Sequence, residues 1–274
     1  MVLFLVTSST LGNLLPLASW NKNPYLEAVQ DEYISPMETD QLHIYYEWRI
    51  EFFRWSKSGG TTMKNLGEAW WFAEGGIVRI RTRAYNLGGS VQYCRLYQDI
   101  SMIGLPLKVG DCTLLKLKAK TRLSNWNISH VYFNGLYDLW FRVVSTYRGI
   151  TKERDLCIDI AWVTNQPVKH HWIDKNGGFH FYYRLRDARR LKDDWRIHEL
   201  DIKKILDEAS RVGAKLFRWK FNPEDCVFNW IDWGIEIFEG ILYMKGSADI
   251  TGEIDYYKIE YRLKPSCLKR NLSS

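Results

Sequence analysis

The stretch "NWIDWGIEIFEG", residues 229 to 240, alternates between two kinds of side chain. Because successive side chains of a β-strand point to opposite faces, the stretch predicts one strand with two unlike faces. The first face carries four apolar residues that we expect in the core: Ile231, Trp233, Ile235 and Ile237. The second face carries two carboxylates between two aromatic rings: Trp230, Asp232, Glu236 and Phe238. That second composition suits neither a core nor an ordinary solvated surface.

The rest of the chain from about residue 42 reads as short strand-like runs separated by Gly, Asn and Asp. In "TLLKLKAKTRL" (113 to 123) apolar residues alternate with lysines, which indicates one buried face and one wet face. Only "HELDIKKILDEASRVG" (198 to 213) has helical periodicity. The sequence therefore predicts an all-β fold, a two-sheet antiparallel jelly-roll sandwich in one domain, residues 41 to 274, with one short helix near 198 to 212.

Residues 1 to 40 are less regular and are predicted as an irregular N-terminal segment. The segment begins with an apolar run that polar residues interrupt and that has no basic residues before it, so it resembles a degenerate signal peptide. This resemblance favours an extracellular location over a cytoplasmic one. Elsewhere no run approaches the roughly 20 apolar residues of a membrane span, so none is predicted.

Composition narrows the function classes. The 274 residues include 13 Trp and 16 Tyr, and a core alone rarely needs so many indoles. Either many are buried between the sheets or some line a binding surface, and we expect more than half of them in the core. The 38 basic residues are nearly balanced by 32 acidic ones, so no nucleic-acid partner is expected. The five cysteines show no CxxC pair and no histidine at zinc-ligand spacing, so we expect no metal site and no cofactor. The sequence does not decide whether Cys94 and Cys112 form a disulfide bond.

Two further stretches repeat the opening pattern. In "DLCIDIAWV" (155 to 163) Asp155 and Asp159 lie opposite the apolar face, and in "LYDLWF" (136 to 141) Asp138 and Trp140 do so. If these strands are neighbours in one curved sheet, their polar faces line a concave groove. Aromatic rings there stack on sugars, while carboxylates bind hydroxyls or cleave the glycosidic bond. In the alternative interpretation, these carboxylates are paired with Lys or Arg on an exposed sheet face.

A resemblance to a known family follows from these motifs. "WGIEIFEG" resembles the acid/base strand of family 12 glycoside hydrolases, an endo-β-1,4-glucanase type with a concanavalin A-like sandwich, and "LYDLWF" is similar to its Tyr-Asp-Leu-aromatic strand. The resemblance spans roughly residues 110 to 263. It implies that Glu236 is the acid/base and that Asp138 supports the nucleophile. Where the family has its nucleophilic Glu, this chain has Asp155 in register and Asp159 as a second candidate.

The predicted function is accordingly a retaining endo-β-glycanase acting on a polysaccharide or oligosaccharide. Its substrate-binding residues would be Trp140, Trp230, Asp232 and Phe238. The alternative is a non-catalytic carbohydrate-binding or structural sandwich. His180 alternates with Phe179 and Phe181, and either joins the groove or is exposed; the exposed position is favoured.

Overall fold

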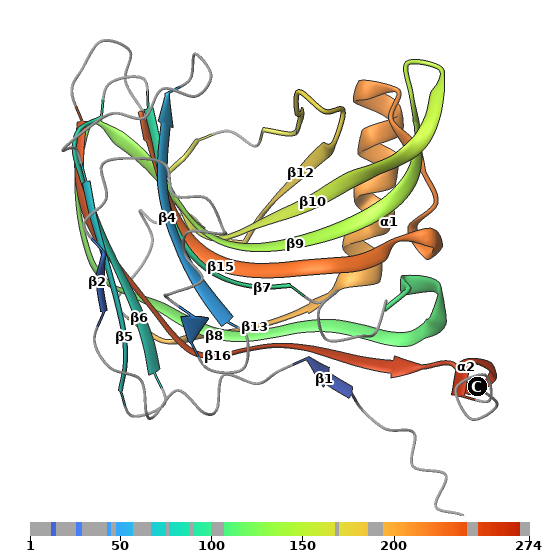
Figure 1. Cartoon of the computed structure of the whole chain (residues 1–274), viewed down its shortest axis with the longest axis horizontal. Helices are drawn as coiled ribbons and strands as arrows, with labels where there is room; N and C mark the ends of the chain where they lie inside the picture. Colours follow the sequence, from blue (N-terminus) through green and yellow to red (C-terminus); the bar gives the residue numbers. More distant parts are fainter. Residues whose placement is uncertain are drawn as a thin grey trace, which may run out of the picture.

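The fold is a sandwich of two β-sheets, as predicted (Figure 1). The computed structural model describes residues 107–167, 170–185, 194–239 and 246–268, and before them the strands at 12–14, 26–28, 43–44, 48–56, 67–74, 77–87 and 90–99. Two three-residue strands lie within the segment predicted to be irregular, while most of the signal-like stretch falls outside the described residues.

The described strands form a seven-stranded and a nine-stranded sheet. The seven-stranded sheet has the order β13 (Arg196–Asp201), β8 (Cys112–Ser129), β16 (Gly246–Leu263), β6 (Ile77–Leu87), β5 (Gly67–Glu74) and β2 (Leu26–Ala28), with β1 (Gly12–Leu14) beside β16. The nine-stranded sheet has the order β11 (Trp172–Ile173), β12 (Phe179–Arg184), β10 (Ile150–Thr164), β9 (Val131–Tyr147), β15 (Val227–Glu239), β7 (Ser90–Asp99), β4 (Trp48–Ser56) and β3 (His43–Ile44), with β14 (Lys220–Phe221) beside β9.

One strand pair departs from the antiparallel pattern. β12 runs parallel to β10, with Cys157 opposite His180, whereas the other pairs among the described strands are antiparallel. A parallel pair cannot be joined by a tight hairpin, and here the chain returns through the short strand β11 before entering β12.

The predicted helix is present but begins later than expected. α1 spans Ile202–Val212 and is capped by Asp201, whose carboxylate accepts hydrogen bonds from the backbone N–H groups of Lys203 and Lys204. The first predicted residues, 198 to 201, instead pair with β8 as part of β13. The helix continues as a π-type turn (Gly213–Phe217). The other helical pieces among the described residues are 3₁₀ turns at Val109–Asp111 and Pro223–Asp225 and a short helix α2 (Pro265–Leu268).

The core lies between the sheets and confirms the predicted strand faces. On β15 the side chains of Ile231, Trp233, Ile235 and Ile237 are at most 1% exposed. On β9 and β10 the same holds for the predicted apolar positions, because Leu139, Phe141, Leu156, Ile158 and Ile160 are fully buried. The opposite faces of these strands therefore point away from the core, toward the concave side of the nine-stranded sheet (Figure 1).

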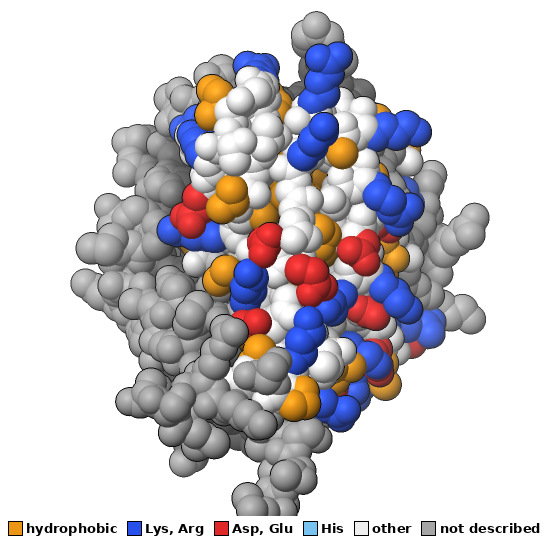
Figure 2. Space-filling model, turned by 90° about the vertical axis from the view of Figure 1, so that its right-hand side faces the viewer, with side chains coloured by type: hydrophobic (Ala, Val, Ile, Leu, Met, Phe, Trp, Pro, Cys, Tyr) orange, Lys and Arg blue, Asp and Glu red, His pale blue; other side chains and the backbone are white. Residues whose placement is uncertain are grey.

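Charges of both signs are mixed over the end of the sandwich near α1, where Figure 2 shows Asp and Glu side chains surrounded by Lys and Arg. Ion pairs in this part of the chain include Lys203 with Glu224 at 2.9 Å and Lys108 with Asp225 at 2.8 Å. All five cysteines are free thiols, so Cys94 and Cys112 do not form the bridge left open by the sequence. Among the described residues no helix is long and apolar enough to cross a membrane.

Candidate functional site

The three carboxylate-bearing strands are neighbours, as the sequence required for a groove. β10, β9 and β15 lie side by side, and their register places Asp159, Asp138 and Asp232 in one row across the sheet. Above this sheet is a cavity of about 550 Å³. The residues around it come mainly from the polar faces of these strands and of β7 and β12: Tyr93, Arg95, Asn134, Leu136, Asp138, Trp140, Asp159, Gln166, His170, Trp172, His180, Tyr182, Trp230, Glu236 and Phe238.

The aspartate row is held together by Tyr93 and Arg95 of β7. The Tyr93 hydroxyl lies 2.7 Å from Asp138 Oδ2 and 2.8 Å from Asp232 Oδ1, while Arg95 Nη1 donates to Asp232 Oδ2 at 2.9 Å. One hydroxyl proton satisfies only one of the two carboxylates, so the second contact needs a proton on a carboxyl group. Burial and the negative charges of Asp232 and Asp159 raise the pKa of Asp138 well above its usual range. Burial also raises the pKa of Asp232, but the charge of Arg95 opposes that shift.

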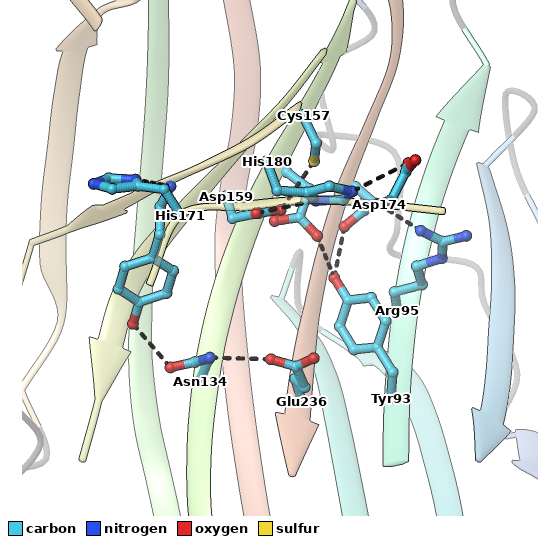
Figure 3. A network of polar contacts seen from close by, with 12 residues as sticks. Tyr93, Arg95, Asn134, Cys157, Asp159, His171, Asp174, His180 and Glu236 are labelled. Atoms are coloured by element: carbon cyan, nitrogen blue, oxygen red, sulfur yellow. Dashed lines mark hydrogen bonds and ion pairs between the residues drawn. The ribbon is translucent and has the colours of Figure 1, made fainter. Parts of the chain in front are cut away.

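Glu236 lies at the other end of the cavity, opposite Asn134 of β9. Asn134 Nδ2 donates to Glu236 Oε2 at 3.0 Å (Figure 3). The side-chain oxygen of the same residue, Asn134 Oδ1, accepts from the Tyr182 hydroxyl at 3.0 Å. Burial, together with the charge of Asp159, raises the pKa of Glu236 to about 7, although the Asn134 hydrogen bond opposes the shift. A carboxyl group with such a pKa gives and takes a proton near neutral pH, which is the requirement for a general acid.

Asp159 contacts two polar side chains, and one of them leads to a second carboxylate. It accepts from Cys157 Sγ at 2.9 Å and pairs with His180 Nδ1 at 3.3 Å, and His180 Nε2 lies 3.8 Å from Asp174 Oδ2. Burial lowers the pKa of His180, but the carboxylates of Asp159 and Asp174 outweigh it and bring that pKa to about 9. His180 is thus an imidazolium ion in the cavity wall, with a side chain only 13% exposed, and not the exposed residue favoured by the sequence.

Aromatic rings line the cavity between these groups. Trp140 and Trp230 pack edge to face at 5.1 Å, and Trp172 stacks on His180 at 4.3 Å with an interplanar angle of 11°. The Trp140 indole N–H is buried and has no acceptor among the described residues. Of the four predicted substrate-binding residues, Trp140, Trp230 and Phe238 line the cavity, whereas Asp232 is fully buried beside Arg95 and does not.

Asp155 lies outside the cavity. It faces Arg142 in the register of β9 and β10 and borders a second, smaller pocket of about 280 Å³. Four residues along β10 separate it from Asp159, which corresponds to about 13 Å. The structure therefore does not bring Asp155 toward Glu236, and Asp159 is the nearer of the two predicted partners.

Glu236 and Asp159 face the same cavity without touching. In the register of the sheet they are two strands and four residues apart, which is roughly 16 Å between Cα atoms on a flat sheet. The nine-stranded sheet is curved (Figure 1), and the charge of Asp159 contributes to the raised pKa of Glu236. The floor between them is apolar and includes Leu136 and Ala161.

Several cavity residues were missed by the sequence interpretation. The alternation of "VQYCRLYQDI" does put Tyr93 and Arg95 on one face, and Asn134 is four residues before Asp138 on the same face of β9. These signals were present, but nothing in the sequence tells that β7 pairs with β15 or that β12 runs beside β10.

Comparison with known proteins gives a likeness only to solved structures. No protein-family model matches the chain, and no curated protein matches it. The structures similar to it include a metagenome-derived family 12 endoglucanase (18% identity over 88% of this chain and all of that one, TM-score 0.49). They also include the family 11 xylanase of Neocallimastix patriciarum (10% identity, 91% and 100% coverage, TM-score 0.46) and a family 12 xyloglucanase from Bacillus licheniformis (11%, 87% and 100%, TM-score 0.43). The weak family 12 resemblance expected from the sequence is thus found among solved structures, at a level that carries no argument about activity.

Proposed function

We propose that the chain binds a glycan in the 550 Å³ cavity and hydrolyses it, as an endo-β-glycanase type of glycoside hydrolase. The observation that carries the proposal is Glu236, whose pKa is about 7, facing an aromatic cavity that also contains Asp159. Two carboxyl groups, one of them protonated near neutral pH, are the groups that hydrolysis of a glycosidic bond uses.

In this proposal Glu236 donates its proton to the leaving glycosidic oxygen. The Asn134 amide then stabilises the Glu236 carboxylate, because its N–H donates to the charged form. Asp159 is the second carboxylate, held in place by the Cys157 thiol and the His180 imidazolium. Trp140 and Trp230 line the cavity and offer their rings to the sugar.

The spacing of the pair decides the stereochemistry. Retention needs carboxyl groups about 5–5.5 Å apart, whereas inversion needs about 6.5–9.5 Å to admit a water molecule. Glu236 and Asp159 are offset by two strands and four residues, and Asp is one methylene shorter than the Glu of the family it resembles. We therefore expect inversion, in place of the retention that the resemblance implies, and NMR of the first-formed product anomer tests it.

A second candidate function is glycan binding without hydrolysis. It is favoured by Asp159, whose two carboxylate oxygens already bind Cys157 and His180, which leaves it poorly placed to activate a water molecule. The aromatic cavity serves this function equally well.

The test is Glu236→Gln, assayed on soluble β-1,4-glucan, xylan and xyloglucan. We expect reducing-end release to fall by about 10²–10⁴-fold, while affinity electrophoresis shows unchanged glycan binding. The matched control is Glu253→Gln on the other sheet, which should leave turnover unchanged. A parent protein that binds glycan but never hydrolyses it supports the second function, and one that does neither contradicts both.

A further inference from the structure

We propose that Cys157, Asp159 and His180 form a binding site for a zinc-class divalent cation in the wall of the cavity. One ligand atom from each residue lies within 4.8 Å of the other two, and Figure 3 shows the three side chains converging. Cys157 and Asp159 share one face of β10, two residues apart, and the parallel partner β12 places His180 directly opposite Cys157. The sequence predicted no metal site because this proximity arises from strand pairing and not from a spacing along the chain.

The ligand atoms are close to the spacing that a tetrahedral ion requires. Metal–ligand distances of 2.0–2.3 Å imply about 3.3–3.8 Å between neighbouring ligand atoms of a tetrahedron. Here Cys157 Sγ is 2.9 Å from Asp159 Oδ1, and His180 Nδ1 is 3.3 Å from Asp159 Oδ2. The Asp159 carboxylate thus lies between the thiol and the imidazole, and all three ligand atoms lie within 4.8 Å of one another.

The surroundings of His180 are those of a metal-bound imidazole. A ligating histidine commonly gives its second N–H to a carboxylate, which fixes the ring and its tautomer. His180 Nε2 lies 3.8 Å from Asp174 Oδ2, and Asp174 is itself held by the backbone N–H groups of Asn176 and Gly178. Trp172 stacks on the imidazole, so the ring is held on its face as well as at Nε2.

The donor set selects the kind of ion. A thiolate, an imidazole and a carboxylate together suit Zn²⁺ and similar ions, whereas Ca²⁺ and Mg²⁺ prefer oxygen ligands alone. Asp159 and His180 line the cavity, and the thiol of Cys157 is buried behind them. Three protein ligands with a fourth position toward the cavity leave room for water or for a ligand hydroxyl.

The inference does not rest on the proposed function. The ion displaces the thiol proton of Cys157 and the proton between His180 and Asp159, and it occupies the carboxylate that hydrolysis would use. A bound ion is therefore expected to inhibit hydrolysis and not to assist it. Metal binding has its own spectroscopic readout, so it can be tested whether or not the protein hydrolyses any glycan.

The experiment is a Co²⁺ titration of the full chain, followed by absorbance and by displacement with Zn²⁺. We expect one equivalent of Co²⁺, a thiolate-to-cobalt charge-transfer band, and visible bands of a four-coordinate ion, all removed by Zn²⁺. Cys157→Ser should abolish the charge-transfer band. Cys267→Ser, which removes a thiol of α2 outside the cavity, should keep it.

A second variant keeps the test decisive if Cys157→Ser does not fold, which circular dichroism would reveal. Asp174→Asn leaves all three ligands in place and is expected to weaken Co²⁺ binding about 10–100-fold with the charge-transfer band intact. The proposal is overturned if no stoichiometric Co²⁺ binds, if the band survives in Cys157→Ser, or if Asp174→Asn binds Co²⁺ as tightly as the parent.

Discussion

The outer face of the seven-stranded sheet and the concave face of the nine-stranded sheet both carry carboxylates. Where the structure describes the side chains, those on the outer face lie beside Lys or Arg, whereas Asp138 and Glu236 on the concave face do not. On the outer face Asp249 binds Arg81 at 2.7 Å and Arg83 at 3.0 Å. Glu253 lies between Arg79 and Arg122, at 2.7 and 2.5 Å. The Arg81 and Arg83 hydrogen bonds lower the pKa of Asp249 despite its burial. Burial raises the pKa of Glu253, but the two arginines have the larger combined effect, so the pKa of Glu253 is lowered.

The concave face shows the opposite electrostatics. Burial raises the pKa values of Asp138, Asp232 and Glu236, and of these three only Asp232 has an arginine beside it. Strand alternation is the same on both sheets, so the sequence pattern alone does not separate them. The difference teaches that carboxylates on the outer face stabilise the fold, whereas those on the concave face are kept at a cost to stability, as is common in functional sites.

The largest expected effect concerns Arg95, which pairs with Asp232 in the aspartate row. Arg95→Met leaves the buried charge of Asp232 without its partner, which should cost about 3–5 kcal/mol of unfolding free energy at neutral pH. The loss should shrink on acidification, because the raised pKa of Asp232 lets it take up a proton. Urea unfolding at pH 5 and pH 8 measures the loss of unfolding free energy and its dependence on pH.

Its control is Arg83→Met on the outer face. Asp249 keeps Arg81 in that variant, and the pair is partly exposed, so the loss should stay below about 1 kcal/mol. If Arg95→Met and Arg83→Met lose equal amounts of unfolding free energy, the proposed difference between the two sheets is wrong.

The next effect is on the pH dependence of stability. The pKa of Glu236 in the folded protein, about 7, exceeds the ordinary value of 4.5. The stability that proton binding by Glu236 gives to the folded state is therefore complete below pH 4.5 and is lost as pH rises through 7. Glu236→Gln should therefore match the parent at pH 4 and be more stable at pH 8, by at most about 3 kcal/mol. The partial exposure of this side chain makes that figure an upper limit.

Glu253→Gln should behave in the opposite way. The folded pKa of Glu253 is lowered, so its contribution is present above the ordinary value of 4.5 and lost as pH falls through the folded pKa. This variant should be less stable than the parent at pH 8 and similar to it at low pH. Thermal unfolding of both glutamine variants from pH 3 to pH 9 would contradict the comparison if the two curves moved in the same direction.

The last prediction concerns the close approach of β7 and β15 at Gly234. A Cβ on Gly234 of β15 would stand 2.5 Å from the Cys94 carbonyl oxygen and 2.8 Å from Arg95 Cβ, so β7 and β15 must shift apart. Gly234→Ala should cost about 1–3 kcal/mol. On the other sheet, a Cβ on Gly252 would meet side chains and no backbone: Ile235 Cδ1 at 3.0 Å and Trp233 Cζ2 at 3.4 Å. Gly252→Ala should therefore cost less, as measured by denaturant unfolding.

Local sequence determined the strand faces. Alternation in "NWIDWGIEIFEG" places Ile231 and Trp233 in the core and Glu236 away from it, because the period of two is a property of any extended chain. The same rule holds for Asp138 and Asp159. The helix was found from its apolar stripe, but its start was set by the Asp201 cap and by the pairing of residues 196 to 201 with β8.

Tertiary structure alone decided which of these residues meet. Register placed Asp159 beside Asp138 and left Asp155 outside the cavity, although the two lie on the same face of β10 and look equivalent in the sequence. The parallel entry of β12 brought His180 to Cys157, and the pairing of β7 with β15 brought Arg95 to Asp232. Pairing between strands distant in sequence depends on how whole sheets bury their apolar faces, so no local pattern encodes it.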